Sequence, residues 1–269
     1  MVDLKKRPFY LDDQAAAWVL NTLDSMTVEE KVGQLFCIMG QKYSPETLQS
    51  MVADGKIGGV LFRPEPAERI RSWFAALDEV AKVPLLKAAN LEEGGVGGVA
   101  DGTLFGWPML SAATDDEKIV EKHGKVCAIE GRSAGINWTF SPVCDIDMNF
   151  RNPITNVRTY GSDKDRVQRF TQEYVKAVQD CGMAACAKHF PGDGVDYRDQ
   201  HLHPTYNSLS AQEWYKTYGA IYQNLIDHDL MSIMVGHIVQ PYVAMEIRGV
   251  EREPSFQASA TERYGRGIR

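Results

Sequence analysis

The residues best suited to chemistry lie in one segment of the chain, 186–203. Its apolar start ends at Lys188 and His189, Pro191 and Gly192 then break the pattern, and a loop rich in Asp and His follows. An apolar strand that delivers titratable groups into a glycine-hinged loop is a common arrangement at the active sites of α/β enzymes. We therefore expect the functional site where this strand ends.

Within this loop, a carboxylate and an imidazole stand two residues apart, as Asp199 and His201. A local bend would let both side chains face one pocket. A carboxylate that accepts a hydrogen bond from one imidazole nitrogen fixes the tautomer and raises the basicity of the ring, which suits a general acid/base. The pair predicts acid/base catalysis; the alternative is a solvated polar loop.

Other side chains suit substrate binding. A lysine at the end of a buried strand, such as Lys188, is costly to bury unless it meets a carboxylate or substrate oxygens. Arg158, in the irregular loop 152–161, could clamp hydroxyl groups or a carboxylate. The alternatives are a structural ion pair for Lys188 and a surface position for Arg158.

The loop that contains Asp199 and His201 also carries groups that could bind a metal ion. Its oxygen and nitrogen donors are Asp193, Asp196, Asp199, His201 and His203. His201 and His203 at a strand end could hold zinc in a metal-dependent hydrolase. Loops of this kind are more often held by hydrogen bonds, so we predict no metal ion and no cofactor.

Composition narrows the class of partner. The chain has 269 residues and a net charge of −7, which argues against a nucleic-acid or anionic-membrane partner. The sequence contains neither a signal-peptide pattern nor an apolar run of about 18–20 residues, the length of a membrane span. Five scattered cysteines indicate free thiols in a reducing compartment, so we expect a cytoplasmic protein.

Apolar strands and amphipathic helices alternate along the chain. Strands are expected at 33–39, 57–62, 84–89, 137–144, 183–189 and 231–237. Thr27 with Glu30, and Ser210 with Glu213, have the spacing of capping boxes at helix starts. Continuous apolar strands flanked by helices indicate a parallel sheet covered on both faces. The G-x-G-x-x-G motif of a dinucleotide fold is absent after the first strand.

Polar residues follow nearly every expected strand, which favours a barrel with its site at the carboxyl ends of the strands. They are Asn90, Glu92, Asp145, Asp147, Lys188, His189 and His237. An open doubly wound sheet also fits the alternation, but the fold predicted is α/β, a TIM-type (β/α)8-like barrel of which about six βα units are found. Either the barrel is incomplete, or another segment or chain fills the gap. The barrel domain is expected at 1–245, followed by an irregular charged tail at 246–269.

The spaced motifs resemble those of a known family. Lys188-His-Phe-Pro-Gly-Asp-Gly194, followed after four residues by Asp199-Gln-His201, is similar to the K-H-F-P-G-x-G-x4-D-x-H signature of family 3 glycoside hydrolases. The Asp-x-His element resembles their β-N-acetylglucosaminidase branch in particular. The likeness runs in order over about residues 20–242, with further matching segments at 26–35, 57–62, 141–145 and 152–161.

The resemblance implies a (β/α)8-like barrel and retaining hydrolysis of a terminal β-linked N-acetylhexosamine. His201 would be the general acid/base, held by Asp199, where most retaining glycosidases use a carboxylic acid. The implied sugar-binding residues are Lys188, His189, Arg158, Asn90 and Asp145. At the position of Asn90 the family usually has an aspartate, and the amide can hydrogen-bond without charge.

One family motif is not found in this sequence. The family nucleophile is an Asp in a V-V-T-D-A-like strand well after the segment that corresponds to Gly236-His-Ile238. Truncation or a frame shift before that strand is one hypothesis, and a catalytically impaired carbohydrate-binding homologue is an alternative function. Missing strands would leave an open barrel edge, which favours self-association.

Overall fold

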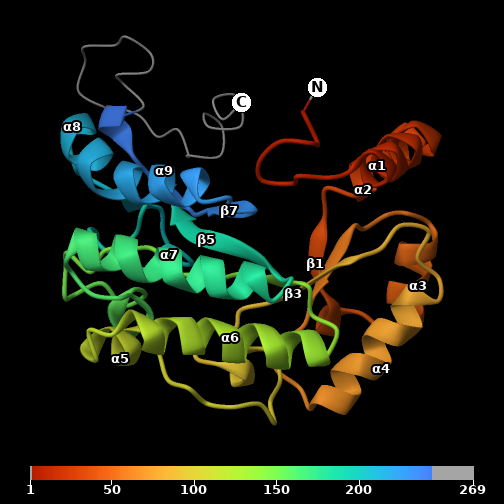
Figure 1. The fold of residues 1–269 in the computed structure, drawn as a ribbon, viewed down its shortest axis with the longest axis horizontal. Helices are drawn as coiled ribbons and strands as arrows, with labels where there is room; N and C mark the ends of the chain where they lie inside the picture. The colour runs from red at the N-terminus through yellow and green to blue at the C-terminus, as the bar shows by residue number, and fades with distance from the viewer. Residues whose placement is uncertain (1, 244–269) are drawn as a thin grey trace. The chain divides into compact units, whose positions relative to one another are not determined.

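The computed structural model describes residues 2–243 (Figure 1). The expected domain boundary at 245 and the expected tail at 246–269 lie outside the described residues. Six strands of the described part are hydrogen-bonded in the order β1-β2-β3-β4-β5-β7, and two more form the pair β6-β8. The predicted α/β class is confirmed, and the six strands of the main sheet match the incomplete barrel that the sequence predicts.

The chain divides into two compact units. Of the described residues, the first comprises 2–105, 126–139 and 181–184, and the second comprises 106–125, 140–180 and 185–243. Helix α6 (Glu117–Ser133) contributes residues to both. No helix within residues 2–243 combines the length and the apolar character needed to cross a membrane.

The first unit contains a parallel four-stranded arrangement. Its strands are β1 (Cys37–Met39), β2 (Gly59–Leu61), β3 (Leu86–Ala89) and β4 (Trp138–Thr139), each in parallel register with the next. Its helices are α1 (Asp13–Ser25), α2 (Val28–Gly33), α3 (Pro45–Ala53) and α4 (Ala67–Asp78), with short 3-10 turns η1 (Gly40–Lys42) and η2 (Gly95–Gly97). Helices α3 and α4 pack against each other (Figure 1).

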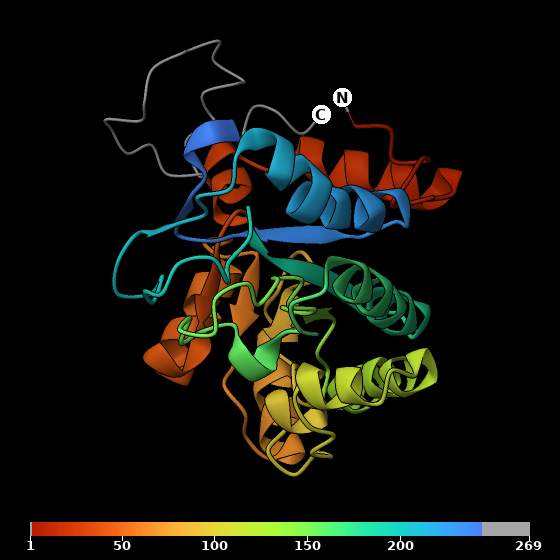
Figure 2. The ribbon, with the colours of Figure 1, turned by 90° about the vertical axis from the view of Figure 1, so that its left-hand side faces the viewer.

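The second unit is built around β5 (Ala184–Phe190) and β7 (Ser232–Val235), which pair in parallel with a register shift between Ala187 and Phe190. The other elements are α5 (Pro108–Ala113), η3 (Asn156–Arg158), α7 (Lys164–Asp180), β6 (Thr205–Tyr206), α8 (Ala211–Trp214), the π-helix η4 (Tyr215–Gly219), α9 (Ala220–Asp227) and β8 (Ile238–Val239). Helices α7 and α9 lie side by side (Figures 1 and 2).

Five of the six expected strands are shorter than the sequence predicts, and the stretch expected at 137–144 forms only β4, Trp138–Thr139. The start of the first strand shows why. The apolar stretch 33–39 was expected to be extended throughout, yet Gly33 ends helix α2 and β1 covers only Cys37–Met39. The capping box of Thr27 and Glu30 is present and starts α2 where expected. A short apolar run fits a helix end as well as a strand start, so periodicity alone does not separate the two.

Candidate active site

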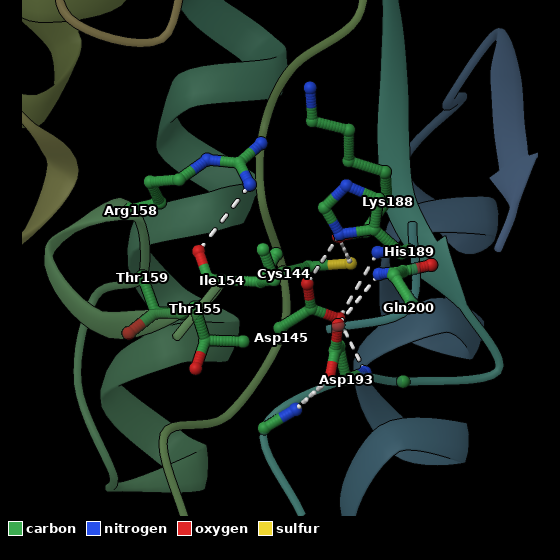
Figure 3. A network of polar contacts seen from close by, with 12 residues as sticks. Cys144, Asp145, Ile154, Thr155, Arg158, Thr159, Lys188, His189, Asp193 and Gln200 are labelled. Carbon is green, nitrogen blue, oxygen red and sulfur yellow. Dashed lines mark hydrogen bonds and ion pairs between the residues drawn. The ribbon is translucent and has the colours of Figure 1, made fainter. Parts of the chain in front are cut away.

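Strand β5 carries Lys188 and His189 into the second unit at fixed positions. The backbone N–H of Lys188 donates to the carbonyl of Pro142 at 3.1 Å, and its carbonyl accepts from the N–H of Cys144 at 2.8 Å. The small side chains Ala185, Cys186 and Ala187 are buried along the strand. The residue Lys188 is only 2% exposed, and its ammonium group points away from the carboxylates of Asp145 and Asp193 (Figure 3).

A buried network of carboxylates begins at the His189 ring, with Asp145 against the ring and Asp193 beyond it (Figure 3). Asp145 Oδ2 lies 2.6 Å from His189 Nδ1, and Asp145 Oδ1 accepts from the backbone N–H of His189 at 3.1 Å. The backbone N–H of Asp193 donates to the same Oδ1 at 2.8 Å. Three acceptor contacts hold the Asp145 carboxylate, so the His189 ring and the start of the following loop share one anchor.

Asp193 extends this network toward the rest of the loop. Its Oδ1 accepts from Asn152 Nδ2 at 2.8 Å and from the N–H of Gly194 at 2.7 Å, and its Oδ2 accepts from Gln200 Nε2 at 2.6 Å. Burial and the nearby charge of Asp145 raise the pKa of Asp193 above its ordinary value of 3.8. The two buried carboxylates therefore accept from three backbone N–H groups and two side-chain amides, and one of them contacts the imidazole.

The loop turns at Gly192, which has a φ of 127°. A Cβ atom there would lie 2.2 Å from Tyr218 Cδ1, so this position accepts only glycine. The Tyr218 hydroxyl donates to the carbonyl of Ile146 at 3.1 Å and to that of Asp193. Burial and the charge of Asp145 raise the pKa of Tyr218 well above 10, which keeps the hydroxyl a donor.

Asp199 and His201 lie farther along the same loop and form a direct pair. Asp199 Oδ1 is 2.7 Å from His201 Nδ1 and also accepts from the backbone N–H of His201 at 2.8 Å. The side chains are 26% and 60% exposed, respectively. Burial pushes the pKa of Asp199 upward, but the backbone and ring hydrogen bonds from His201 outweigh it and lower that pKa below 3.8.

Another carboxylate anchors the residues just before Asp199. Asp196 binds the guanidinium group of Arg198 and accepts from the N–H of Tyr206 at 2.8 Å. The Arg198 guanidinium carbon also lies 5.1 Å from the centre of the Tyr206 ring. Within residues 2–243, no group of three or more His, Cys, Asp or Glu side chains is arranged to hold a metal ion, so the metal-dependent alternative gains no support from the geometry.

The two remaining candidates occupy different units. Arg158, at the end of η3, donates to the carbonyl of Ile154 at 3.4 Å, and its guanidinium extends toward the side to which the Lys188 ammonium points (Figure 3). Asn90 follows β3 in the first unit and lines a cavity of about 60 Å³ there with Arg63 and Gly97. Asp145, Lys188, His189 and Arg158 belong to the second unit together with Asp199 and His201.

Three residues of this network were not among the sequence candidates. They are Asn152, Gln200 and Tyr218. Asn152 begins an Asn-Pro loop, a turn signal that says nothing about the buried carboxylate it binds. Gln200 is the unspecified middle residue of the Asp-x-His element, and Tyr218 sits in a helical stretch that the sequence marks only as amphipathic.

Comparison with known proteins gives these residues a context. A family model described as the glycosyl hydrolase family 3 N-terminal domain matches residues 27–251. A β-N-acetylglucosaminidase/β-glucosidase of Cellulomonas fimi is 45% identical over 248 residues, which are 92% of this chain and 44% of that protein. A β-hexosaminidase of Stenotrophomonas maltophilia (strain K279a) is 27% identical over 80% of this chain and 66% of its own length. The chain thus spans less than half of the first relative.

Two solved structures are similar to most of this chain. The β-glucoside phosphorylase BglX superimposes with a TM-score of 0.87 at 44% identity, over 95% of this chain and 45% of that one. A family 3 β-N-acetylglucosaminidase from Paenibacillus sp. str. FPU-7 superimposes with a TM-score of 0.76 at 28% identity, over 81% of this chain and 43% of that one. Both similarities support the incomplete-barrel description.

Proposed function

Because this chain belongs to glycosyl hydrolase family 3, we propose that it takes part in cleaving the β-glycosidic bond of a terminal N-acetylhexosamine, with His201 as the general acid/base. The observation that carries this proposal is the exposed Asp199–His201 pair, 2.7 Å apart, on a loop that begins at the buried network around His189. The names of the relatives from Cellulomonas fimi and Paenibacillus support the substrate class.

In this proposal the hydrogen bond to Asp199 decides which nitrogen of His201 reacts. The carboxylate occupies Nδ1, so Nε2 is left to exchange a proton with the substrate. In the first step, Nε2–H protonates the glycosidic oxygen as the bond to the sugar breaks. In the second step, the same nitrogen takes a proton from the attacking water.

The sugar itself would be bound by Lys188, His189 and Arg158. Lys188 and Arg158 bring cationic donors to one side of the network, which suits the hydroxyl and carbonyl oxygens of a sugar. Asp145 acts through His189: it occupies Nδ1 and thereby presents Nε2 to a hydroxyl group. In the first unit, Asn90 is proposed as a neutral hydrogen-bonding residue for substrate.

The retaining route also needs a carboxylate nucleophile. By resemblance to the family, this carboxylate would follow Gly236-His-Ile238. Residues beyond 243 lie outside the described part of the chain. Without that group, turnover would fall by several orders of magnitude, while the sugar-binding residues would remain. A carbohydrate-binding homologue without turnover is therefore the direct competitor of this proposal.

Inorganic phosphate as the acceptor is a second candidate reaction. The observation that favours it is the 44% identity, with a TM-score of 0.87, to a protein named a β-glucoside phosphorylase. A phosphate oxygen would attack the anomeric carbon as its bond to the nucleophile breaks, and the phosphate proton would pass to His201. A neutral imidazole does not repel an approaching phosphate anion, whereas a carboxylate base in its place would.

The test uses a p-nitrophenyl β-N-acetylglucosaminide with the protein in buffer, with and without inorganic phosphate. We expect release of p-nitrophenol, with N-acetylglucosamine as the product in water and its 1-phosphate as an added product if phosphate is an acceptor. Calorimetry with N-acetylglucosamine runs beside it. Binding without turnover would favour the carbohydrate-binding homologue. The absence of both binding and turnover would overturn the proposal.

We also propose that the protein is cytoplasmic and that it self-associates. The five cysteines are all free thiols, which agrees with a reducing compartment. Size-exclusion chromatography tests the second point, because a monodisperse monomer would contradict association through an open sheet edge.

A further inference from the structure

In the later part of the loop after β5, residues 197–204, Gln200 is the one buried residue. In Figure 2 the loop extends away from the end of β5. His201 and its neighbour Leu202 are exposed, the latter by 75%, whereas Gln200 is only 4% exposed. The side chain of Gln200 therefore points inward at the position where Asp199 and His201 must be held.

Both ends of the Gln200 amide are bound to the structure beneath the loop. Its Nε2 donates to Asp193 Oδ2 at 2.6 Å, and its Oε1 accepts from the backbone N–H of His237 at 3.1 Å. The carboxylate accepts only and the N–H donates only, so the orientation of the amide is fixed. One side chain thus connects the loop to the buried network and to the residue pair that follows β7.

The neighbours of Gln200 bond to different partners. Among the described residues of 197–204, Arg198 binds Asp196, and Asp199 and His201 bind each other, so these contacts stay within the loop. The N–H groups of Leu202 and His203 donate to the carbonyl of Asp199 and close a local turn. The side chain of Gln200, in contrast, forms hydrogen bonds from residues 197–204 to Asp193 and to His237.

The position facing Gln200 is built to admit it. A Cβ atom on Gly236 would lie 2.7 Å from Gln200 Oε1 and 3.2 Å from His189 Cβ. Any larger residue at 236 would therefore displace the amide from its place between Asp193 and His237. Gly236 also pairs with the strand that carries the site, since its N–H donates to the carbonyl of Phe190 at 2.8 Å.

We propose that Gln200 is a positioning residue, which fixes the Asp199–His201 pair by tying its loop to Asp193 and to His237. The proposal rests on the function proposed above and adds the device that sets where the acid/base stands. A reacting group displaced by about 1 Å can lose on the order of 100-fold in rate. The contact between Gln200 and the network is thus expected to act on turnover more than on sugar binding.

The experiment compares Gln200→Met, Gly236→Ala and the double variant, with Leu202→Ala as the matched control from the same loop. Gln200→Met keeps the length of the side chain and removes both hydrogen bonds. Gly236→Ala keeps the amide and displaces it. We expect amide hydrogen exchange at 201–203 to accelerate at least tenfold in all three, while exchange in β5 and α7 stays unchanged.

For the kinetics we expect kcat to fall about 100-fold in either single variant, with the affinity for N-acetylglucosamine changed less than about threefold. The double variant should lose no more than either single one, because both changes break the same contact. Leu202→Ala should match the wild type in exchange and in kcat.

Unchanged exchange at 201–203 in both single variants would overturn the proposal, whatever the activity of the protein. Additive losses in kcat, or a loss of sugar affinity as large as the loss of kcat, would also overturn it. A wild type without turnover would defeat the proposed function and leave the hydrogen-exchange comparison to decide the role of Gln200.

Discussion

Two carboxylate–imidazole pairs in the second unit have the same bond and opposite surroundings. Asp145 lies 2.6 Å from His189 Nδ1, and Asp199 lies 2.7 Å from His201 Nδ1. The side chains of the first pair are 0% and 7% exposed, and those of the second are 26% and 60% exposed. The bond alone does not define a role, because its environment decides whether the imidazole is held in place or left open to exchange protons.

The two pairs also differ in how the chain brings them together. Asp145 and His189 are separated by 44 positions, and Asp145 accepts two backbone N–H groups besides the ring. Asp199 and His201 are two positions apart and meet in a local turn. The buried pair therefore depends on the fold and stabilises it, whereas the exposed pair depends on its loop and contributes little to stability.

The largest effect is expected from removing the exposed imidazole. His201→Ala should lower kcat by about 10²–10⁴-fold, because no group then protonates the leaving oxygen. A leaving group that needs little protonation, such as p-nitrophenol, should show the smaller loss. Thermal unfolding of the variant should match the wild type. A His201→Ala protein with full turnover would separate the exposed pair from catalysis.

Removing the buried carboxylate should act on stability instead. Asp145→Ala leaves the backbone N–H groups of His189 and Asp193 without an acceptor in a dry site, so we expect the free energy of unfolding to fall by about 3–5 kcal/mol. Urea denaturation measures this. The matched control is Asp199→Ala, whose partner is exposed, with an expected loss below about 1 kcal/mol. Equal losses in the two variants would erase the contrast between the pairs.

The difference in chain separation also explains what the sequence could predict. The pairing of Asp199 with His201 is local, and so are the two capping boxes, at Thr27 with Glu30 and at Ser210 with Glu213, which the structure confirms. Such contacts follow from spacing because the backbone brings the groups together without help from distant segments.

Contacts between distant segments were not predictable in this way. Gln200 meets the N–H of His237 across 37 positions, and nothing in the local sequence distinguishes it from a solvated glutamine. The partner of His189 is Asp145, which the sequence offered as a polar residue at a strand end and, by resemblance, as a sugar-binding residue, but not as the partner of this ring. The strand expected at 33–39 is present but begins only at Cys37, since a short apolar run fits both a helix end and a strand.

A smaller effect on turnover is expected when the exposed pair keeps its ring and loses its carboxylate. Asp199→Ala leaves His201 without the acceptor that fixes its tautomer, so kcat should fall about 10–100-fold, less than in His201→Ala. Hydrolysis of the aryl glycoside measures it. The double variant Asp199→Ala with His201→Ala should be no slower than His201→Ala alone, and a further loss would mean that Asp199 has a role of its own.

The smallest expected effect is on the pH dependence of stability, which should differ between Asp193 in the buried network and Asp196 in the loop. Burial and the charge of Asp145 raise the pKa of Asp193 above 3.8, so ionised Asp193 costs the folded state stability at neutral pH. That cost is absent below 3.8 and grows as the pH rises through the folded pKa. Burial also acts on Asp196, but the hydrogen bonds from Arg198 and Tyr206 lower its pKa below 3.8, so its contribution to stability is lost only as the pH falls below that value.

Acidification from about pH 7 to about pH 4, just above the ordinary pKa of 3.8, should therefore affect the two carboxylates differently. In the wild type, protonation of Asp193 over this interval removes the destabilisation that its buried charge causes. Asp193→Asn has no such charge to lose, so the variant should lose more stability on acidification. Asp196→Asn should follow the wild-type slope, because the titration of Asp196 lies below the interval. Urea denaturation at the two pH values gives both slopes. A wild-type slope in Asp193→Asn would mean that Asp193 keeps an ordinary pKa in the fold, and the buried network would then be no drier than the loop beside it.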